Sequence, residues 1–470
     1  MVAGSVSLPA ALATQRLSAC PWPNSRLGGS VSACSNTMIE CRGVEAFAGV
    51  GDLCWVTKRG NPSLTSDRSQ TNVGEASKTV GEQAGILCEI VALKSDHAIL
   101  LPYFETDGIS LGSCVWLDDG LKAVRPSIEW RGRVVDALAN PIDGKGALTA
   151  GDQSIPLMRR PIAAHERTAM GGRMTTGVTA LDLFTPCCFG QRLGIFAGSG
   201  VGKSSLISMI AQHCEADLMV IGLIGERGRE LHDFLSHTLG PEGLERSVVV
   251  AATSDMPAMM RRRAAYLSMA VAEYFRDQGY RVLCLLDSVT RFAMALREIY
   301  LAAGEPPTTK GYPPTVFAEL PRLLERAGPG PKSDGSITGL FSVLVEGDDT
   351  NEPISDTVRG ILDGHVIMDR QIAERGRFPA IDVLQSVSRT APGCYTPAER
   401  PLIDQARRLM RLNVEMTDLI QLGAYQQGAN AEVDQAVAFS RNMENLLHQP
   451  LDHGVDVDQA WRQLALHLQA

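Results

Sequence analysis

The chain of 470 residues lacks the features that identify several protein classes. No apolar run approaches the roughly 20 residues that a membrane-spanning helix requires, so an integral membrane protein is not expected. Its 11 cysteines include no Cys-x-x-Cys pair and their number is odd, and Cys88, Cys114 and Cys284 lie within apolar runs. We therefore expect buried cysteines in a reducing compartment, without zinc or disulfide bonds.

Basic residues are outnumbered by acidic ones. The chain has 44 Lys and Arg against 53 Asp and Glu, a formal net charge of −9. Because binding to nucleic acid requires clustered Lys and Arg at the phosphates, nucleic acid is not expected as a partner. Hydrophobic residues make up 44%, which is enough for large cores, and the length predicts about two or three domains.

The composition of the chain changes near residue 40. Residues 1–40 are rich in Ser, Ala, Gly and Pro and have no basic start followed by a long apolar stretch, so they are interpreted as a variable or disordered tail rather than an export signal. Residues 41–118 consist of short apolar runs separated by Gly, Asp and Ser, which predicts a small β-barrel or sandwich with a long polar loop at 57–78. Its predicted strands include Gly85–Leu93, Ala98–Pro102 and 113–117.

Strands alternate with helices in residues 119–393, the pattern of an α/β domain with a mostly parallel sheet. Within it, residues 134–146 carry Asn-Pro and Asp-Gly turn signals and are interpreted as a linker. Residues 394–470 are predicted to be helical. The expected strands are 193–196, 218–223, 248–251, Arg281–Asp287 and 337–345, and the expected helices are 259–278, 401–412, 416–425, Ala431–Leu447 and 457–468.

A glycine-rich segment directly follows the predicted strand 193–196. It reads Ala-Gly-Ser-Gly-Val-Gly-Lys-Ser and matches a phosphate-binding P-loop, apart from Ala197, where the strict pattern has glycine. The glycines let backbone N–H groups converge on an anion, and the helix predicted over 202–213 directs its positive end to the same place. A glycine-rich turn is the alternative, which the flanking strand and helix disfavour. The residues predicted to bind a nucleoside triphosphate are Ala197, Gly198, Ser199, Gly200, Val201, Gly202, Lys203, Ser204 and Ser205.

Four side chains near the ends of predicted strands could form a hydrolytic site. Lys203 would reach the β- and γ-phosphates, and the Ser204 hydroxyl would bind Mg²⁺. Asp287 ends an apolar strand and could hold the Mg²⁺ shell, cap the following helix, or do both. Glu226 follows another strand at the carboxyl edge of the sheet, where it is the best candidate to polarise the attacking water. A solvated charged loop is the alternative for Glu226.

Further motifs occur in one order along the chain, at residues 225–230 (Gly-Glu-Arg-Gly-Arg-Glu), 286–291, 313–317, 345–349 and 386–389. Together with the P-loop they resemble the type III secretion ATPases, which are related to the catalytic subunits of rotary ATP synthases. Within this family the chain is most similar to the flagellum-specific export branch. The resemblance spans roughly residues 80 to 450. It implies an N-terminal β-barrel, a RecA-type P-loop domain and a C-terminal helical domain.

The resemblance also implies roles for individual residues. Lys203 and Ser204 would hold ATP and Mg²⁺, Glu226 would be the catalytic carboxylate, Arg227 would support the phosphate, and Asp287 would be the acid of the metal shell.

Two further roles concern residues that lie after the predicted sheet strands. Arg389 would be an arginine finger delivered from the neighbouring subunit of a ring, although its spacing alone does not distinguish it from a surface arginine. Phe378 would contact the adenine, with core packing as the alternative.

An ATPase that forms a homohexamer and assists the export of flagellar proteins is the function that the resemblance implies. It would be cytoplasmic and peripheral to the inner membrane. Its expected partners are regulator and stalk proteins, the export gate and chaperone–substrate complexes, with ATP and Mg²⁺ as cofactors.

Four alternatives stay open at this point. An injectisome ATPase would have the same motor. A rotary synthase subunit would carry an acidic Asp-Glu-Leu-Ser-Glu type stretch in its helical domain, which residues 395–447 lack. A hexamer that translocates RNA, similar to the terminator Rho, would need an aromatic and basic barrel, whereas residues 41–117 have few aromatics and no basic cluster. A non-hydrolysing scaffold is disfavoured by Glu226 and Asp287.

Overall fold

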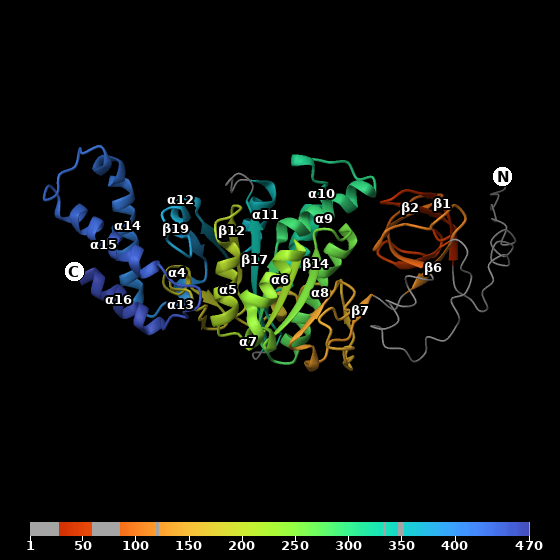
Figure 1. The fold of residues 1–470 in the computed structure, drawn as a ribbon, viewed down its shortest axis with the longest axis horizontal. Coiled ribbons are helices and arrows are strands. Elements are labelled where there is room, and N and C mark those ends of the chain that lie inside the picture. Colours follow the sequence, from red (N-terminus) through yellow and green to blue (C-terminus); the bar gives the residue numbers. More distant parts are fainter. Residues whose placement is uncertain (1–27, 59–84, 119–121, 332–334, 346–351, 470) are drawn as a thin grey trace, which may run out of the picture.

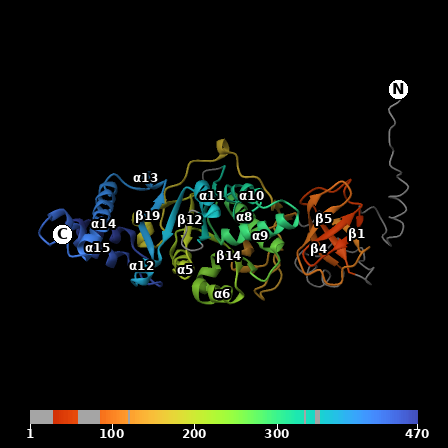
Figure 2. The same cartoon turned by 90° about the horizontal axis from the view of Figure 1, so that it is seen from above.

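The computed structural model describes residues 28–58, 85–118, 122–331, 335–345 and 352–469. They form a barrel, a central sheet covered by helices, and a helical region, which follow one another along the longest axis of the molecule (Figures 1 and 2). The expected α/β class with a mostly parallel sheet is confirmed. Residues 1–27, most of the expected loop at 57–78 and most of the 345–349 motif lie outside the described residues.

Antiparallel strands close the barrel in the order β1-β2-β5-β4-β3-β6. The barrel begins at Gly28, inside the segment expected to be a tail, because β1 closes it between β2 and β6. A Cβ at Gly29 would lie 2.5 Å from the Arg42 carbonyl oxygen, so glycine permits the close approach to β2. The prediction of a tail is therefore wrong from Gly28 onwards, where the small residues allow strands to pair closely. The strands are β1 (Gly28–Cys34), β2 (Ile39–Arg42), β3 (Leu53–Thr57), β4 (Gly85–Leu93), β5 (Ala98–Pro102) and β6 (Cys114–Asp118).

The central region is built on a nine-stranded sheet in the order β19-β18-β12-β17-β15-β13-β14-β8, with β16 paired to β17. Its pairs are parallel except β18 with β19 and β16 with β17. The segment expected to be a linker at 134–146 contributes the edge strand β8, where Val134 pairs with Val249. The strands are β8 (Arg133–Val135), β12 (Arg192–Ala197), β13 (Leu218–Glu226), β14 (Ser247–Thr253), β15 (Arg281–Asp287), β16 (Gly328–Pro329), β17 (Ser336–Leu344), β18 (Gly364–Met368) and β19 (Ile381–Ser388).

Both faces of this sheet are buried. Along β13, Val220 belongs to one hydrophobic core, whereas Met219 and Ile221 belong to the other. Because successive side chains of a strand point to opposite faces, a strand between two cores reads as a continuous apolar run. The helices of this region are α4 (Thr179–Phe184), α5 (Lys203–His213), α6 (Gly228–Asp233), α7 (Gly240–Glu245), α8 (Ala258–Asp277), α9 (Val289–Ala302), α10 (Pro314–Leu324), α11 (Pro353–Ile361), α12 (Arg370–Glu374) and α13 (Ala391–Cys394).

The C-terminal region consists of α14 (Glu399–Gln421), α15 (Ala431–Leu447) and α16 (Val457–Gln469). Two helices were expected where α14 is continuous. The intervening residues Asn413, Val414 and Glu415 include neither glycine nor proline, so nothing interrupts the hydrogen bonds of the helix. No helix among the described residues is both long and apolar enough to cross a membrane.

A disulfide bond joins Cys188 to Cys394, which are 206 residues apart. The expectation that the cysteines do not pair is therefore wrong at this position. Cys188 lies in β11 (Cys187–Cys188), which pairs with β10 (Arg173–Met174), and Cys394 ends α13. Spacing could not reveal the pair, because the fold brings the two cysteines together from distant parts of the chain.

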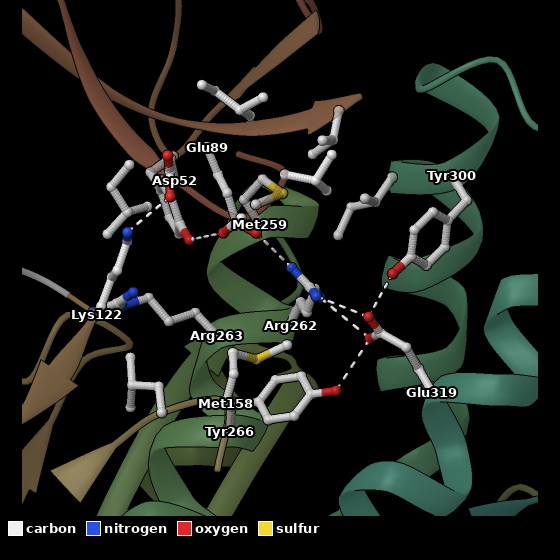
Figure 3. Close-up of a pocket in the computed structure, with 18 of the residues that line it drawn as sticks. Asp52, Glu89, Lys122, Met158, Met259, Arg262, Arg263, Tyr266, Tyr300 and Glu319 are labelled. Atoms are coloured by element: carbon white, nitrogen blue, oxygen red, sulfur yellow. Dashed lines mark hydrogen bonds and ion pairs between the residues drawn. The ribbon is translucent and has the colours of Figure 1, made fainter. Parts of the chain in front are cut away.

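A cavity of about 670 Å³ lies between the barrel and helices α8, α9 and α10. Figure 3 shows Arg262 of α8 between Glu89 of β4 and Glu319 of α10. Its Nη1 lies 2.8 Å from Glu89 Oε1, and its Nη2 lies 2.8 Å from Glu319 Oε1. The hydroxyls of Tyr266 and Tyr300 donate to Glu319 as well. The polar groups therefore satisfy one another and link the barrel to the central region.

Replacing Arg262 by alanine is expected to destabilise the protein strongly. Two mostly buried carboxylates would lose their cation, and breaking such a pair costs about 3–5 kcal/mol in free energy of unfolding. Urea unfolding followed by circular dichroism measures the loss. The control is Arg408→Ala, because Arg408 and its partner Glu432 are 68% and 52% exposed and such pairs contribute about 0–1 kcal/mol. Equal effects of the two variants would contradict the proposed link.

Candidate active site

The P-loop connects β12 to α5. Gly200 and Gly202 have φ angles of +77° and +92°, in the left-handed region that favours glycine. A Cβ at Gly200 would meet nothing within 4 Å, so the space above the loop is open. The N–H of Leu206 is the first that bonds back to the Gly202 carbonyl. The preceding N–H groups of α5 are therefore available to an anion, and Ser204 lies exposed beside them.

Three charged side chains meet at the carboxyl ends of β12, β13 and β15. Lys203 forms an ion pair with Asp287, and its Nζ lies 3.7 Å from Glu226 Oε1. In the sheet, β12 and β15 flank β17, and β13 lies next to β15. The ends of these parallel strands consequently bring together residues that are 84 positions apart in the sequence. This is the edge at which open α/β sheets bind ligands.

Glu226 has the electrostatic properties of a proton acceptor. Burial and the neighbouring Asp287 raise its pKa to about 7, although Lys203 lowers it. Its Oε1 is buried without a hydrogen-bond partner among the described residues. A carboxylate with a pKa near the working pH is suited to general base catalysis. The alternative of a solvated charged loop does not fit this environment.

Asp287 does not cap the following helix. Ser288 takes that position, since its Oγ accepts a hydrogen bond from the N–H of Arg291 at 3.2 Å. The carboxylate of Asp287 instead contacts Lys203 and accepts a hydrogen bond from Ser342 Oγ at 2.5 Å.

The oxygens at this site fit Mg²⁺ together with a nucleotide. Mg²⁺ prefers carboxylate, hydroxyl and phosphate oxygens and usually keeps several waters. Asp287, Ser204 and the orphaned oxygen of Glu226 supply such groups. Among the described residues, no group of three or more His, Cys, Asp or Glu could hold a metal ion. Because Mg²⁺ is usually held by one or two carboxylates together with the phosphates of a substrate, these side chains would bind it jointly with the phosphates.

Arg227 pairs with Glu230 and not with Lys203, Glu226 or Asp287. Its side chain is 72% exposed and forms an ion pair with Glu230 at 3.8 Å. A contact of Arg227 with phosphate, which the resemblance implied, would require its side chain to turn.

Phe378 lies beside the P-loop. A Cβ at Gly202 would be 3.5 Å from its ring, and the residue is 39% exposed, so core packing does not explain its position. The Phe378 carbonyl accepts a hydrogen bond from Gln449 N–H at 2.8 Å, which joins this loop to the C-terminal region. The position is suited to stacking on a base.

Replacing Phe378 by alanine is expected to raise the KM for ATP about tenfold or more, with kcat nearly unchanged. Base–aromatic stacking contributes roughly 1–3 kcal/mol, and the uncharged Phe378 side chain cannot act on the phosphates itself. Phe378→Tyr should retain the wild-type KM. The control is Val387→Ala, another exposed apolar residue. An unchanged KM in Phe378→Ala would exclude stacking.

Arg389 lies at the opposite end of the sheet from its own P-loop. Its N–H donates to the Asp363 carbonyl, and the Asp363 N–H donates to the carbonyl of Arg192, where β12 begins. From there β12 extends to Ala197, a distance of about 17 Å at about 3.3 Å per residue. Arg389 is exposed and follows the edge strand β19.

Sequence reasoning missed two residues that contact the site. Ser342 is almost fully buried and donates to Asp287. The polar side chain within the apolar run of β17 was the signal that could have revealed it. Arg370 donates from Nη2 to the carbonyl of Ser199 in the P-loop at 3.2 Å. No sequence pattern distinguishes Arg370 from the other arginines around it.

Comparisons with known proteins agree with this geometry. Residues 177–388 match the ATP synthase alpha/beta family, nucleotide-binding domain, and residues 395–466 match the T3SS EscN ATPase C-terminal domain. The flagellum-specific ATP synthase of Caulobacter vibrioides is 48% identical and covers 94% of this chain and 96% of its own. The type 3 secretion system ATPase of Xanthomonas euvesicatoria is 45% identical over 82% of this chain and 86% of its own.

The fold is similar to that of a solved relative. The assembled ATPase EscN from the type III secretion system of enteropathogenic E. coli superposes with a TM-score of 0.83 at 35% identity, over 94% of this chain and 100% of the EscN chain in that structure. EscN in complex with its central stalk EscO gives a TM-score of 0.80. The chain therefore belongs to the family of flagellum-specific and type III secretion ATPases, which are ATP-hydrolysing enzymes with an ATP-synthase-like nucleotide-binding domain.

Proposed function

We propose that this chain is the ATPase of a flagellar type III export apparatus and that it works as a homohexameric ring. The meeting of Lys203, Glu226 and Asp287 beside an open P-loop carries the proposal for hydrolysis. The flagellar assignment rests on the similarity to flagellum-specific relatives over nearly the whole chain. The assembled state of EscN supports a ring.

The side chains divide the work of hydrolysis between them. Lys203 leaves Asp287 to bind the β- and γ-phosphates, while the first N–H groups of α5 hold the phosphate oxygens. Ser204 and Asp287 would hold Mg²⁺, which would supply charge neutralisation at the phosphates when it is bound. Glu226 accepts a hydrogen bond from the attacking water and takes its proton. Arg389 of a neighbouring subunit neutralises charge on the transferring phosphate.

The remaining partners follow from the same assignment. The complex of EscN with its stalk EscO supports a stalk protein in the centre of the ring. Regulator proteins, the export gate and chaperone–substrate complexes would complete a cytoplasmic assembly at the inner membrane. An injectisome is the second candidate, favoured by the similarity to the Xanthomonas ATPase.

Three measurements test the proposal. ATP hydrolysis by the purified full chain should depend on Mg²⁺ and be absent in Lys203→Ala, and light scattering should detect a hexamer with a nonhydrolysable ATP analogue. Expression in a bacterium that lacks its flagellar ATPase should restore swimming. Restored secretion by an injectisome mutant, without swimming, would instead favour the second candidate. A monomer under all nucleotide conditions would contradict the ring.

A further inference from the structure

Ser342 occupies a central place behind the charged cluster. It lies on β17, which is paired in parallel to β12 on one side and to β15 on the other. Its backbone is therefore held between the strand that leads into the P-loop and the strand that ends at Asp287. The side chain is 1% exposed, and its Oγ lies 2.5 Å from Asp287 Oδ1.

The oxygen that Ser342 contacts is also the one that Lys203 contacts. Asp287 Oδ1 thus receives a hydrogen bond from a neutral hydroxyl and an ion pair from an ammonium group. When ATP binds, Lys203 turns to the phosphates and its contact with Asp287 is lost. The Ser342 hydroxyl can keep its contact with Asp287, because β17 is paired to a strand on each side.

We propose that Ser342 is a positioning residue that keeps the carboxylate of Asp287 oriented after Lys203 has left it. This inference rests on the ATPase function proposed above. The hydrogen bond to Oδ1 restricts rotation of the carboxylate, so that Asp287 would stay placed to hold Mg²⁺ together with the phosphates. A neutral donor achieves this without adding a positive charge that would repel the metal ion.

Burial makes the hydroxyl hard to replace. Asp287 is 6% exposed and Ser342 is 1% exposed, so little room is left for a water molecule to take over the hydrogen bond. Removing a partner from a buried charged group leaves that group unsatisfied, which costs more than the net value of an ordinary hydrogen bond. In Ser342→Ala, the carboxylate would be free to rotate once Lys203 has turned to the phosphates.

The test compares Ser342→Ala and Ser342→Thr with the wild type in the full chain. A fluorescent ADP analogue is titrated first in EDTA and then with increasing Mg²⁺, so that nucleotide binding and the contribution of the metal are measured separately from turnover. We expect Ser342→Ala to bind the analogue in EDTA within about twofold of the wild type. Its half-saturating Mg²⁺ concentration should rise and its kcat should fall, each by roughly tenfold or more, the scale of a hydrogen bond to a charged group. Ser342→Thr should restore both.

The matched control is Thr338→Val on the same strand. Thr338 is equally buried, and its hydroxyl accepts a hydrogen bond from Gly190 N–H at 3.0 Å, away from the charged cluster. It should lower thermal stability without changing the Mg²⁺ dependence. The positioning role is wrong if Ser342→Ala leaves the Mg²⁺ dependence unchanged, as Thr338→Val should. It is also wrong if Ser342→Thr folds but does not have the Mg²⁺ dependence and kcat of the wild type. If the wild type binds nucleotide but never hydrolyses it, the proposed function fails, while the Mg²⁺ titration still decides the role of Ser342.

Discussion

Glu226→Gln is expected to bind ATP with wild-type affinity and to hydrolyse it roughly 10²–10⁴ times more slowly, the range for loss of a general base. Glutamine has nearly the same shape as glutamate, so the P-loop and Lys203 are left in place. The amide cannot accept the proton of the attacking water. Equilibrium binding of a fluorescent ATP analogue and single-turnover hydrolysis of labelled ATP measure the two properties separately.

The pH dependence gives a second readout of the same residue. Burial raises the pKa of Glu226 to about 7, so the carboxylate form that acts as a base is populated mainly above this pH. The kcat/KM of the wild type should therefore rise with pH through about 7, and the residual activity of Glu226→Gln should lack this inflection.

Glu242→Gln is the matched control, because Glu242 is an exposed glutamate on α7, outside the cluster of Lys203, Glu226 and Asp287. The control should retain nearly full activity. If Glu226→Gln loses ATP affinity while each bound ATP is still hydrolysed at the normal rate, Glu226 binds the nucleotide and is not the base.

Local sequence patterns predicted the central fold well, because its strands are buried on both faces. The strand at Arg281–Asp287 was predicted with its observed bounds. In the C-terminal region, the helix α15 was also predicted with its observed bounds. Two predictions were wrong, because in each case the same sequence pattern is compatible with a loop and with a strand. The Ser-, Ala-, Gly- and Pro-rich composition of residues 1–40 suggested a tail, but the glycines at the start of β1 allow close strand contact in the barrel. Turn signals beside Val134 suggested a linker, although sheet pairing with Val249 decides the structure there.

The candidate site was predictable to the extent that its residues stand at strand ends. Lys203, Glu226 and Asp287 each follow or end an apolar run, and parallel strands bring such ends together. The contact of Ser342 with Asp287 could not be predicted, because it depends on β17 lying between β12 and β15, and strand order is not visible in local patterns. The interdomain network around Arg262 was missed for the same reason, since it joins three segments that are distant in the sequence.

Arg389→Ala is expected to bind ATP normally and to hydrolyse it about 10³–10⁵ times more slowly, the range for loss of an arginine finger. The geometry excludes action on its own P-loop, because Arg389 is bonded next to the start of β12 and the loop lies about 17 Å away at its end. The exposed position after the edge strand is accessible to a neighbouring subunit. Arg375→Ala, which removes another exposed arginine, serves as the control and should remain active.

Mixing two inactive variants separates action on a neighbour from a structural role. A ring formed from Arg389→Ala and Lys203→Ala chains contains interfaces at which an intact P-loop from the first meets an intact Arg389 from the second. Such mixtures should regain part of the wild-type turnover, with a maximum near equal amounts of the two chains. If Arg389 only stabilises its own subunit, Arg389→Ala should lower the melting temperature and no mixture should restore turnover. Absence of rescue in rings shown by native mass spectrometry to contain both chains would therefore rule out an arginine finger acting between subunits.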